Sequence, residues 1–497
     1  MIFQEIYRNN LEIFIPEFFI TTIFLTLLLF GTFYEKTKNN ESVLIIRTLN
    51  RLIIYLLLIT LLLTFNIQIP NLVLAHGTFI HDALTKFAKI ILIYSTISCF
   101  VMQQKYIVEQ KIVRFENSIL FLIALFGSML LVSSYNLISL YLAIEVQSLC
   151  SYILTASQRH SALSAEAGLK YFVLGAIGSS FILLGSSILY GVTGTLDFAD
   201  FFMIVSNLSG ENATIYLKGI FIGLFFLLSG LLFKMGAVPF HSWLPDVYEG
   251  APNHVTAFFA IVPQISYVAL FIRIFFDIFE DISVYFETML WIVAFGSILI
   301  GTLASLQQNK FKRLLAYSSI VHVGFVLIGF TTNSITTIST ILLYVTLYVV
   351  MNIALWTFYL SFNINNKPIK YLTDLTGISK LNKSLFFIVT LILFSLAGIP
   401  PLAGFFSKMF ILMSAIKNQQ FGLVIISTLI SVVSAFYYIR VVKIIYFENV
   451  NKVRFVNSMS KGQSLLIILN SNIVLLFFFF PNYILTYLNK IYLYMLI

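Results

Sequence analysis

Long apolar runs follow one another along the whole sequence. Stretches such as 11–33, 335–362 and 420–447 contain few charges, and each is long enough to cross a lipid bilayer, which takes about 20 helical residues. Transmembrane β-strands would instead alternate apolar and polar residues over about 10 positions. Only 10% of the residues are charged, against about a quarter in a soluble domain. The sequence therefore predicts an all-α, polytopic membrane protein.

We expect about fourteen transmembrane helices. Their approximate limits are 11–33, 48–67, 83–103, 117–133, 135–156, 167–191, 216–243, 252–276, 284–305, 312–331, 335–362, 384–415, 420–447 and 463–488. The second and the last of these runs are the weakest.

Lysine and arginine residues gather in alternate loops between these spans. The loops after odd-numbered spans contain Lys105, Arg159, Lys310 and Lys367, among others, whereas the loops after even-numbered spans are neutral or acidic. Basic residues accumulate in the loops that stay on the cytoplasmic or matrix side. We therefore expect the odd-numbered loops on that side and both termini on the opposite side.

Several of the predicted spans carry ionisable side chains, among them Glu145, Lys170, Lys234, His322 and Lys408. An ionised group at the bilayer centre costs about 2.5–3.5 kcal/mol on insertion scales, so such residues commonly face the protein interior and mark ion or proton pathways. Structural alternatives also exist. Lys170 can extend to the membrane interface, His322 can be a hydrogen-bonded core histidine, and Glu145 and Lys234 can form one buried ion pair. Lys408 has no acidic residue on its own predicted helix.

Glycine and proline interrupt two of these runs, in GAVP at 236–239 and GIPP at 398–401. Proline removes a backbone hydrogen bond and breaks a helix. In membranes, broken helices are tolerated where they line a protein-buried cavity. Paired breaks in corresponding helices point to an ion site in an inverted-repeat transporter, and spans 4–8 and 9–13 form two such five-helix sets.

A buried lysine beside each break suits proton transfer. Lysine readily changes its protonation state when it is removed from water, and a nearby carboxylate favours the protonated form. We therefore interpret Lys234 as a titratable group in a hydrated path, with its charge controlled by an acidic neighbour.

Five motifs, in this order, resemble one membrane-protein family. It is the chain 2 family of antiporter-like subunits of respiratory complex I, the NADH:ubiquinone oxidoreductase. The motifs are YLAIEVQSLCSYILTA, SAEAGLKYFVLGA, FKMGAVPFHSWLPDVYEGAP, KRLLAYSSIVHVGFVLIG and AGIPPLAGFFSKMFIL.

The resemblance implies two inverted five-helix repeats, helices 4–8 and 9–13, with helices 7 and 12 broken. It divides the chain into an N-terminal three-helix segment (1–116), a first repeat (117–276), a second repeat (284–447) and a C-terminal helix (448–497).

The resemblance also implies a function. The chain would take part in proton translocation driven by electron transfer from NADH to ubiquinone, as a subunit of a translocase. It would bind no cofactor or metal itself, because NADH, FMN, iron–sulfur clusters and ubiquinone would be used by other parts of the complex. Its partners would be other membrane-arm subunits and lipids, with no nucleic acid. The expected location is the mitochondrial inner membrane, before a bacterial plasma membrane.

Particular residues follow from matching the motifs. The proton-relay residues would be Glu145 on helix 5, Lys170 on helix 6, Lys234 on helix 7 and Lys408 on helix 12. To these we add His322, on helix 10, as a further candidate relay residue. Helix 8 departs from the family pattern. Gln264 stands where we align the family's lysine, and a glutamine amide cannot carry a proton at neutral pH.

A relay through the centre would then depend on water organised by Gln264, or on Tyr267, His254 or His322. Two other functions stay open. The chain could be a subunit of a multisubunit cation/proton antiporter, which shares these motifs in variant form, or a structural membrane-arm subunit that does not pump.

Overall fold

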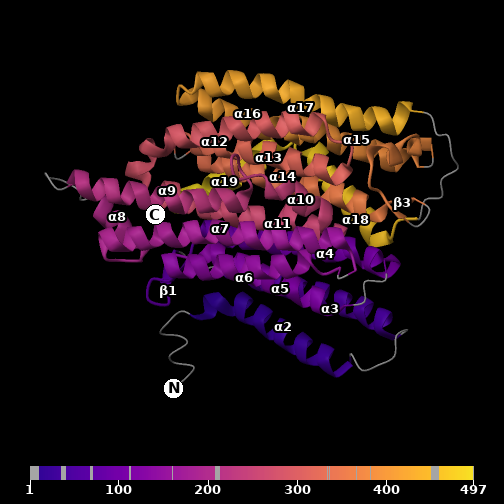
Figure 1. The fold of residues 1–497 in the computed structure, drawn as a ribbon, viewed down its shortest axis with the longest axis horizontal. Helices are drawn as coiled ribbons and strands as arrows, with labels where there is room; N and C mark the ends of the chain where they lie inside the picture. The colour runs from indigo at the N-terminus through magenta and orange to yellow at the C-terminus, as the bar shows by residue number, and fades with distance from the viewer. Residues whose placement is uncertain are drawn as a thin grey trace.

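The computed structural model describes residues 11–34, 41–67, 71–110, 114–158, 160–206, 213–332, 334, 336–364, 367–380, 382–448 and 458–495. Arg159, one of the basic loop residues named above, lies outside these ranges. Most helices run along one common axis (Figure 1). Within the described ranges, 12 helices are long and apolar enough to cross a membrane, or 13 if one bent pair is counted as a span. The predicted class, an all-α polytopic membrane protein, is confirmed.

The long unbroken helices match the predicted spans closely. They are α2 (Ile15–Tyr34), α3 (Glu41–Asn66), α4 (Ala83–Glu109), α5 (Glu116–Ser133), α6 (Leu137–Thr155), α7 (Ala162–Thr193), α11 (Asn253–Ile272), α12 (Glu280–Leu306), α13 (Phe311–Phe330), α14 (Thr337–Ser361) and α17 (Phe421–Phe447).

Two predicted spans are interrupted where glycine and proline predicted a break. Span 7 consists of α9 (Ala213–Met235) followed by α10 (Trp243–Gly250), and span 12 consists of α15 (Lys383–Ala397) followed by α16 (Ala403–Lys417). The two halves of span 12 have 15 residues each, too few to cross a bilayer alone. This break accounts for one of the two predicted spans that are missing from the count of 12, and the bent pair at the end of the chain accounts for the other.

The last predicted span, 463–488, differs from expectation. The chain forms α18 (Lys461–Leu476) and α19 (Pro481–Met495), which meet at an angle of 91°. Proline is well placed at the first position of a helix but cannot continue a preceding one, so Pro481 separates the two. One face of α19 is buried through Leu488 and Ile491, whereas Tyr483 and Tyr487 are exposed.

Short elements outside the spans escaped the sequence analysis. Two small antiparallel hairpins pair β1 with β2 and β3 with β4. The short elements are β1 (Leu72–Leu74), β2 (Phe79–His81), β3 (Asn363–Ile364), β4 (Lys367–Pro368), α8 (Phe198–Ser206), the 3-10 turns η1 (Leu11–Phe14), η3 (Leu372–Leu375) and η4 (Ile378–Lys380), and the π-helical turn η2 (Arg273–Ile278).

Three helices form the centre of the bundle. Between 83% and 89% of the apolar windows of α11, α13 and α14 is buried, against 33% for α3, α7 and α17. Figure 1 shows α2 and α17 at opposite edges, with α11, α13 and α14 between them. Any polar side chain on these three central helices must therefore find its partners within the protein.

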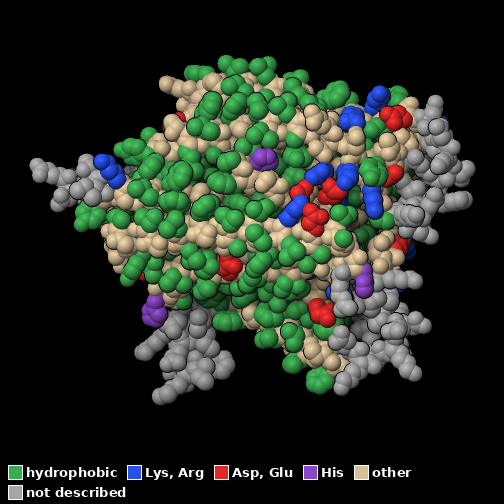
Figure 2. Space-filling view, in the orientation of Figure 1, with side chains coloured by type: hydrophobic (Ala, Val, Ile, Leu, Met, Phe, Trp, Pro, Cys, Tyr) green, Lys and Arg blue, Asp and Glu red, His purple; other side chains and the backbone are tan. Residues whose placement is uncertain are grey.

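The surface is divided between apolar and charged regions. Large apolar side chains cover the outer faces of α7 and α17, for example Phe172, Val173, Val432 and Phe436. Figure 2 shows a broad hydrophobic face, with most of the visible Lys, Arg, Asp and Glu side chains toward the end near β3. This distribution is the one expected for a protein whose sides contact lipid and whose ends contact water.

Candidate functional site

Helix α9 ends one residue after Lys234, at a break formed by glycine and proline. Gly236 has a φ of 73°, in the left-handed region that glycine adopts without strain. The N–H groups of Gly236 and Ala237 donate to carbonyls three and five residues earlier, a C-terminal cap that satisfies the end of the helix. A cis peptide joins Val238 to Pro239 before α10 begins.

The break between α15 and α16 repeats this arrangement. Gly398 has a φ of 88°, and a cis peptide joins Pro400 to Pro401 at the same distance from the glycine. The N–H groups of Gly398 and Ile399 donate to carbonyls three to five residues earlier. Two segments far apart in the sequence thus share one local geometry, and a buried lysine accompanies each: Lys234 and Lys408 are both 7% exposed.

Lys408 reaches back across its break. It lies on α16, but its Nζ donates to the carbonyl oxygens of Leu396 and Ala397, at 3.0 Å each, in the last turn of α15. Its ammonium also lies 5.2 Å from the ring centroid of Phe325. Lys408 forms no ion pair with any carboxylate in the described ranges, so helix carbonyls take the place of an acidic partner.

Lys234 has a different partner, a tyrosine hydroxyl. Its Nζ donates to the Oη of Tyr152, at 3.1 Å, and lies 5.6 Å from the centroid of that ring. Tyr152 is on α6, where Glu145 and Ser148 share one helical face with it by their spacing. Glu145 interacts electrostatically with Lys234, although the two do not form a direct ion pair. The Oε1 atom of Glu145 is buried and has no hydrogen-bond partner in the described part of the chain.

Aromatic side chains continue inward from Tyr152. The ring of Tyr171, on α7, lies 4.7 Å from that of Tyr152, and its other side stacks on Trp243 of α10 at 4.8 Å. Ser151 bonds the Tyr171 hydroxyl at 3.3 Å. Tyr267, on the central helix α11, is buried near Tyr152 and Tyr171.

His322 is the centre of a second polar group. It is buried on α13, where its Nδ1 bonds the Tyr344 hydroxyl at 2.7 Å and its Nε2 bonds the Tyr438 hydroxyl at 3.3 Å. The ring of Tyr348 packs against the imidazole at 4.6 Å. Lys408 acts electrostatically on His322, so this group borders the second broken helix.

Gln264 lies between the two groups. Its half-buried side chain interacts with the Tyr348 hydroxyl, and the Tyr348 ring contacts that of His322. Tyr248 of α10 is a neighbour of both Tyr171 and Tyr348. The predicted residues Glu145, Lys234, Gln264, Tyr267, His322 and Lys408 thus lie along one row of buried and half-buried polar side chains, in which some neighbours share hydrogen bonds and others interact only electrostatically.

Most of the connecting tyrosines were missed by the sequence analysis, which named only Tyr267. The missed members of the row are Tyr152, Tyr171, Tyr248, Tyr344, Tyr348 and Tyr438. The sequence could have suggested these tyrosines, because a tyrosine in a buried apolar helix usually has a hydrogen-bond partner for its hydroxyl. Tyr344 and Tyr348 are also spaced to share one face of α14.

Lys170 lies outside this row. Its side chain is 43% exposed and pairs with Glu166 at 2.8 Å and with Asp246 at 3.0 Å. Arg313 binds the other oxygen of Asp246 at 2.5 Å. Burial alone would raise the pKa of Asp246, but the hydrogen bonds from Lys170 and Arg313 outweigh this effect and hold it below its ordinary value. These contacts attach α10 to α7 and α13 at the charged end.

His254 is also separate from the row. It lies in the first turn of α11, where its ring packs against Tyr106 and Phe121 at centroid distances of 5.7 and 6.0 Å. The imidazole is buried, and neither ring nitrogen has a hydrogen-bond partner in the described ranges. The structure brings His254 close to Lys312.

No group of three or more His, Cys, Asp and Glu side chains within the described ranges could hold a metal ion. Cys99 and Cys150 are buried and unpaired.

The fold and the buried row together define a polytopic membrane subunit of the antiporter-like class. Two solved structures share its architecture. A chain of respiratory complex I from Thermus thermophilus aligns over 95% of this chain and 99% of its own length, with a TM-score of 0.77 and 24% identity. A chain of the Mrp complex from Dietzia sp. aligns over 97% of each chain, with a TM-score of 0.81 and 18% identity.

Sequence comparison narrows the class. Residues 134–434 match the model of the NADH:quinone oxidoreductase/Mrp antiporter transmembrane family, and the chain belongs to this family. NADH-ubiquinone oxidoreductase chain 2 of Marchantia polymorpha is 39% identical over 94% of this chain and 95% of its own. NADH-quinone oxidoreductase subunit N of Paramagnetospirillum magneticum is 39% identical over 87% of this chain and 88% of its own.

Proposed function

We propose that this chain is a membrane-arm subunit of respiratory complex I that takes part in proton translocation coupled to electron transfer from NADH to ubiquinone. The observation that carries the proposal is the buried row. It begins at Glu145 and Lys234, beside one broken helix, and ends at Lys408, beside the other. A row of polar and ionisable side chains in an apolar bundle is costly to bury and is commonly functional in membranes.

The chemistry of the row suits proton transfer. The ammonium of Lys234 can donate its proton toward the Tyr152 hydroxyl, with which it already shares a hydrogen bond. A change in the charge of Glu145 would alter how tightly Lys234 holds that proton. At the other end, His322 contacts tyrosine hydroxyls through both ring nitrogens. It can therefore take a proton on one nitrogen and release one from the other.

Gln264 would organise the middle of the row without carrying charge. A glutamine amide both donates and accepts hydrogen bonds, and Tyr348 is its contact toward His322. We propose that the path passes Gln264 through Tyr348 and water. His254 and Lys170 are proposed to act outside this central path, because the structure places them elsewhere.

The relatives suggest which complex, partner subunits and membrane this chain belongs to. We propose that NADH, FMN, iron–sulfur clusters and ubiquinone are used by other subunits, and that this chain contacts neighbouring antiporter-like subunits and lipid. Relatives of both mitochondrial and bacterial type match it closely. We favour the mitochondrial inner membrane, with the odd-numbered loops in the matrix.

The domain division is also proposed. It comprises residues 1–116, a first repeat over 117–276, a second repeat over 284–447 and a C-terminal segment over 448–497. The two matching breaks, one per repeat, support an inverted duplication of helices 4–8 and 9–13.

Fold likeness alone does not distinguish complex I from a cation/proton antiporter, because both structural neighbours align over nearly the whole chain. The sequence relatives favour complex I, since those at 39% identity are subunits of NADH oxidoreductases. A structural subunit that does not pump is the remaining alternative.

Glu145→Gln tests the proposal directly. The substitution keeps the size of the side chain and removes its charge, so Lys234 loses the electrostatic partner that controls its proton. We expect NADH-driven proton pumping into vesicles to fall at least about tenfold, while the amount of assembled complex stays within twofold of wild type. Glu166→Gln, an exposed carboxylate on α7, is the matched control and should pump normally. Loss of assembly together with loss of pumping would instead indicate a structural role.

Tyr348→Phe tests the route through the centre. Only the hydroxyl is removed, and the ring that packs against His322 remains. We expect proton pumping to fall several-fold with no loss of complex. Tyr359→Phe, on the same helix, removes a hydroxyl that bonds the Ile369 carbonyl outside the row, and it should leave pumping intact. Equal effects of the two substitutions would argue against a path through Tyr348.

A further inference from the structure

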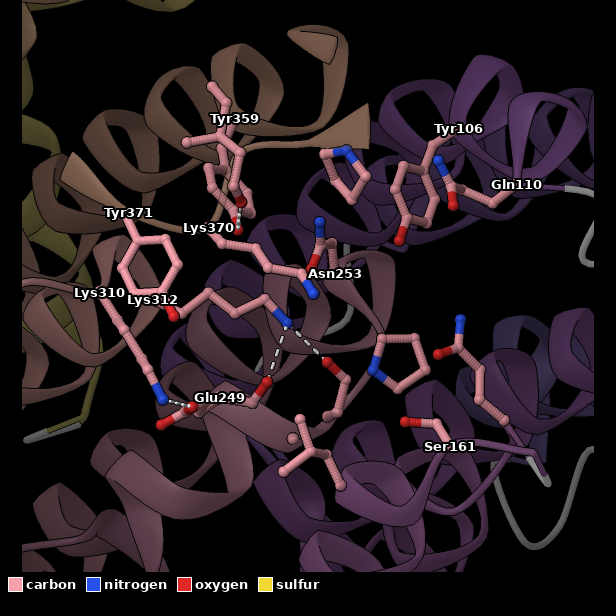
Figure 3. A pocket seen from close by; sticks show the side chains of 17 residues that line it. Tyr106, Gln110, Ser161, Glu249, Asn253, Lys310, Lys312, Tyr359, Lys370 and Tyr371 are labelled. Carbon is pink, nitrogen blue, oxygen red and sulfur yellow. Dashed lines mark hydrogen bonds and ion pairs between the residues drawn. The ribbon is translucent and has the colours of Figure 1, made fainter. Parts of the chain in front are cut away.

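A cavity of about 450 Å³ opens at the charged end of the bundle (Figure 3). Its walls come from the end of α4, the loop before α7, the junction between α10 and α11, the start of α13 and the segment that follows β4. None of the residues of the buried row lines it.

The charges in the cavity do not balance. Lys310, Lys312 and Lys370 line it, together with a single carboxylate, Glu249. Glu249 is already paired with Lys310, and Arg313 contacts it at 3.0 Å. Lys312 and Lys370 form no ion pair with a carboxylate in the described ranges, although the Asp374 carboxylate accepts from the backbone N–H of Lys370. The cavity lining therefore carries about two more positive than negative charges.

Lys312 is the more unusual of these two cations. Its side chain is 8% exposed. Its Nζ donates to the carbonyl oxygens of Ala251 at 2.6 Å and of Glu249 at 3.5 Å. An ammonium has three donor hydrogens, so one remains for a ligand. Glu249 attracts the Lys312 ammonium and Lys370 repels it, and an anion between the two lysines would relieve this repulsion.

Neutral donors complete the arrangement. Figure 3 shows the side-chain ends of Lys312, Lys370 and Asn253 converging on one space, with the Tyr106 hydroxyl turned toward it. Two ammonium groups with amide and hydroxyl donors are a combination that recognises phosphate oxygens. Basic pockets between transmembrane helices on the cytoplasmic or matrix side are also sites for anionic lipid headgroups.

We propose that this cavity binds a phosphate group, held between Lys312 and Lys370. The group would be either free phosphate or the headgroup of an anionic lipid. The cavity is large enough for either. Leu163 on its rim is 56% exposed and continues into the apolar outer face of α7, which offers acyl chains a place to lie. The inference does not depend on proton translocation.

The test uses the intact complex after removal of lipid in detergent. Two probes distinguish the sources: radiolabelled inorganic phosphate in equilibrium dialysis, and phosphatidylglycerol, compared with phosphatidylcholine, in native mass spectrometry. Lys370→Gln is the main variant because Lys370 is exposed and caps no helix. We expect it to weaken the binding of one probe about tenfold, the effect of losing one charge-assisted hydrogen bond. Lys380→Gln, an exposed lysine of the same region outside the cavity, should bind as wild type does.

The two probes distinguish free phosphate from a lipid headgroup as the ligand. Dependence of phosphate binding on Lys370 identifies a free anion as the ligand, and dependence of phosphatidylglycerol retention identifies a lipid. Lys312→Gln should weaken the same probe at least as strongly, provided that the complex assembles. Binding of both probes that is unchanged in Lys370→Gln, or reduced equally in Lys380→Gln, would overturn the proposal.

Discussion

Lys408→Arg should abolish NADH-driven proton pumping while the chain remains in its complex. Arginine keeps a positive charge and has enough donors to bond the Leu396 and Ala397 carbonyls that Lys408 now bonds. It cannot release a proton in a protein. A relay role and a structural capping role therefore predict opposite results. Positioned proton-transfer groups commonly contribute factors of about 10² to 10⁴, so we expect at least about a 100-fold loss of pumping.

The measurement is acidification of vesicles on addition of NADH, with complex content followed on native gels. Lys417→Arg is the control, since Lys417 is an exposed residue at the end of the same helix, α16. Normal pumping by Lys408→Arg would assign Lys408 to the capping of α15 alone. In that case Lys408→Met, which leaves two buried carbonyls without their donor, should lose complex rather than activity.

Lys234→Met should have an effect of similar size at the other end of the row. The substitution removes both the titratable group and the hydrogen bond to Tyr152. It also leaves Glu145, a half-buried carboxylate, without the cation that interacts with it, which is unfavourable in an apolar bundle. We therefore expect pumping to be lost and the yield of complex to fall as well.

The double variant Glu145→Gln with Lys234→Met separates these two effects. Removing both charges avoids the uncompensated carboxylate, so the yield of complex should recover. Pumping should stay lost if Lys234 is a proton carrier. Recovery of pumping together with yield would show that the two residues are only a structural pair. Lys218→Met, at an exposed position on α9, is the single-site control for the loss of a lysine from this helix.

Several features of the fold could be predicted because the bilayer restricts a chain so strongly. Backbone groups in lipid must be satisfied within a helix, so apolar runs of sufficient length gave the spans with few errors. The two breaks were predictable for the same reason, since Gly236 and Gly398 precede prolines inside otherwise continuous runs. Pro481 carried a similar signal near the end of the chain, but a proline can kink a helix or begin a new one, so the sequence did not show that the chain turns there.

The candidate site was only partly predictable. Charged residues inside apolar runs identified Glu145, Lys234 and Lys408, because an ionised group there requires an explanation. A tyrosine does not stand out from an apolar run in this way, because its aromatic ring is itself largely apolar. Only the contacts of the hydroxyl in the structure show whether it belongs to a hydrogen-bond network. The position of Lys170 could not be read from the sequence either. Its partner Asp246 is 76 residues away in the chain, and only the packing of α10 on α7 brings them together.

The two ends of the row differ in the negative groups that lie next to their lysines. The free carbonyls at the end of a helix carry about half a negative charge, and both lysines lie at such an end: Lys234 in the last turn of α9, and Lys408 against the last turn of α15. A helix end does not titrate, so Lys408 has a constant counter-charge at every pH. Lys234 instead donates to the Tyr152 hydroxyl and interacts with the carboxylate of Glu145. A perturbation that acts on the charge of a side chain would therefore affect the Lys234 end of the row and leave the counter-charge of Lys408 unchanged.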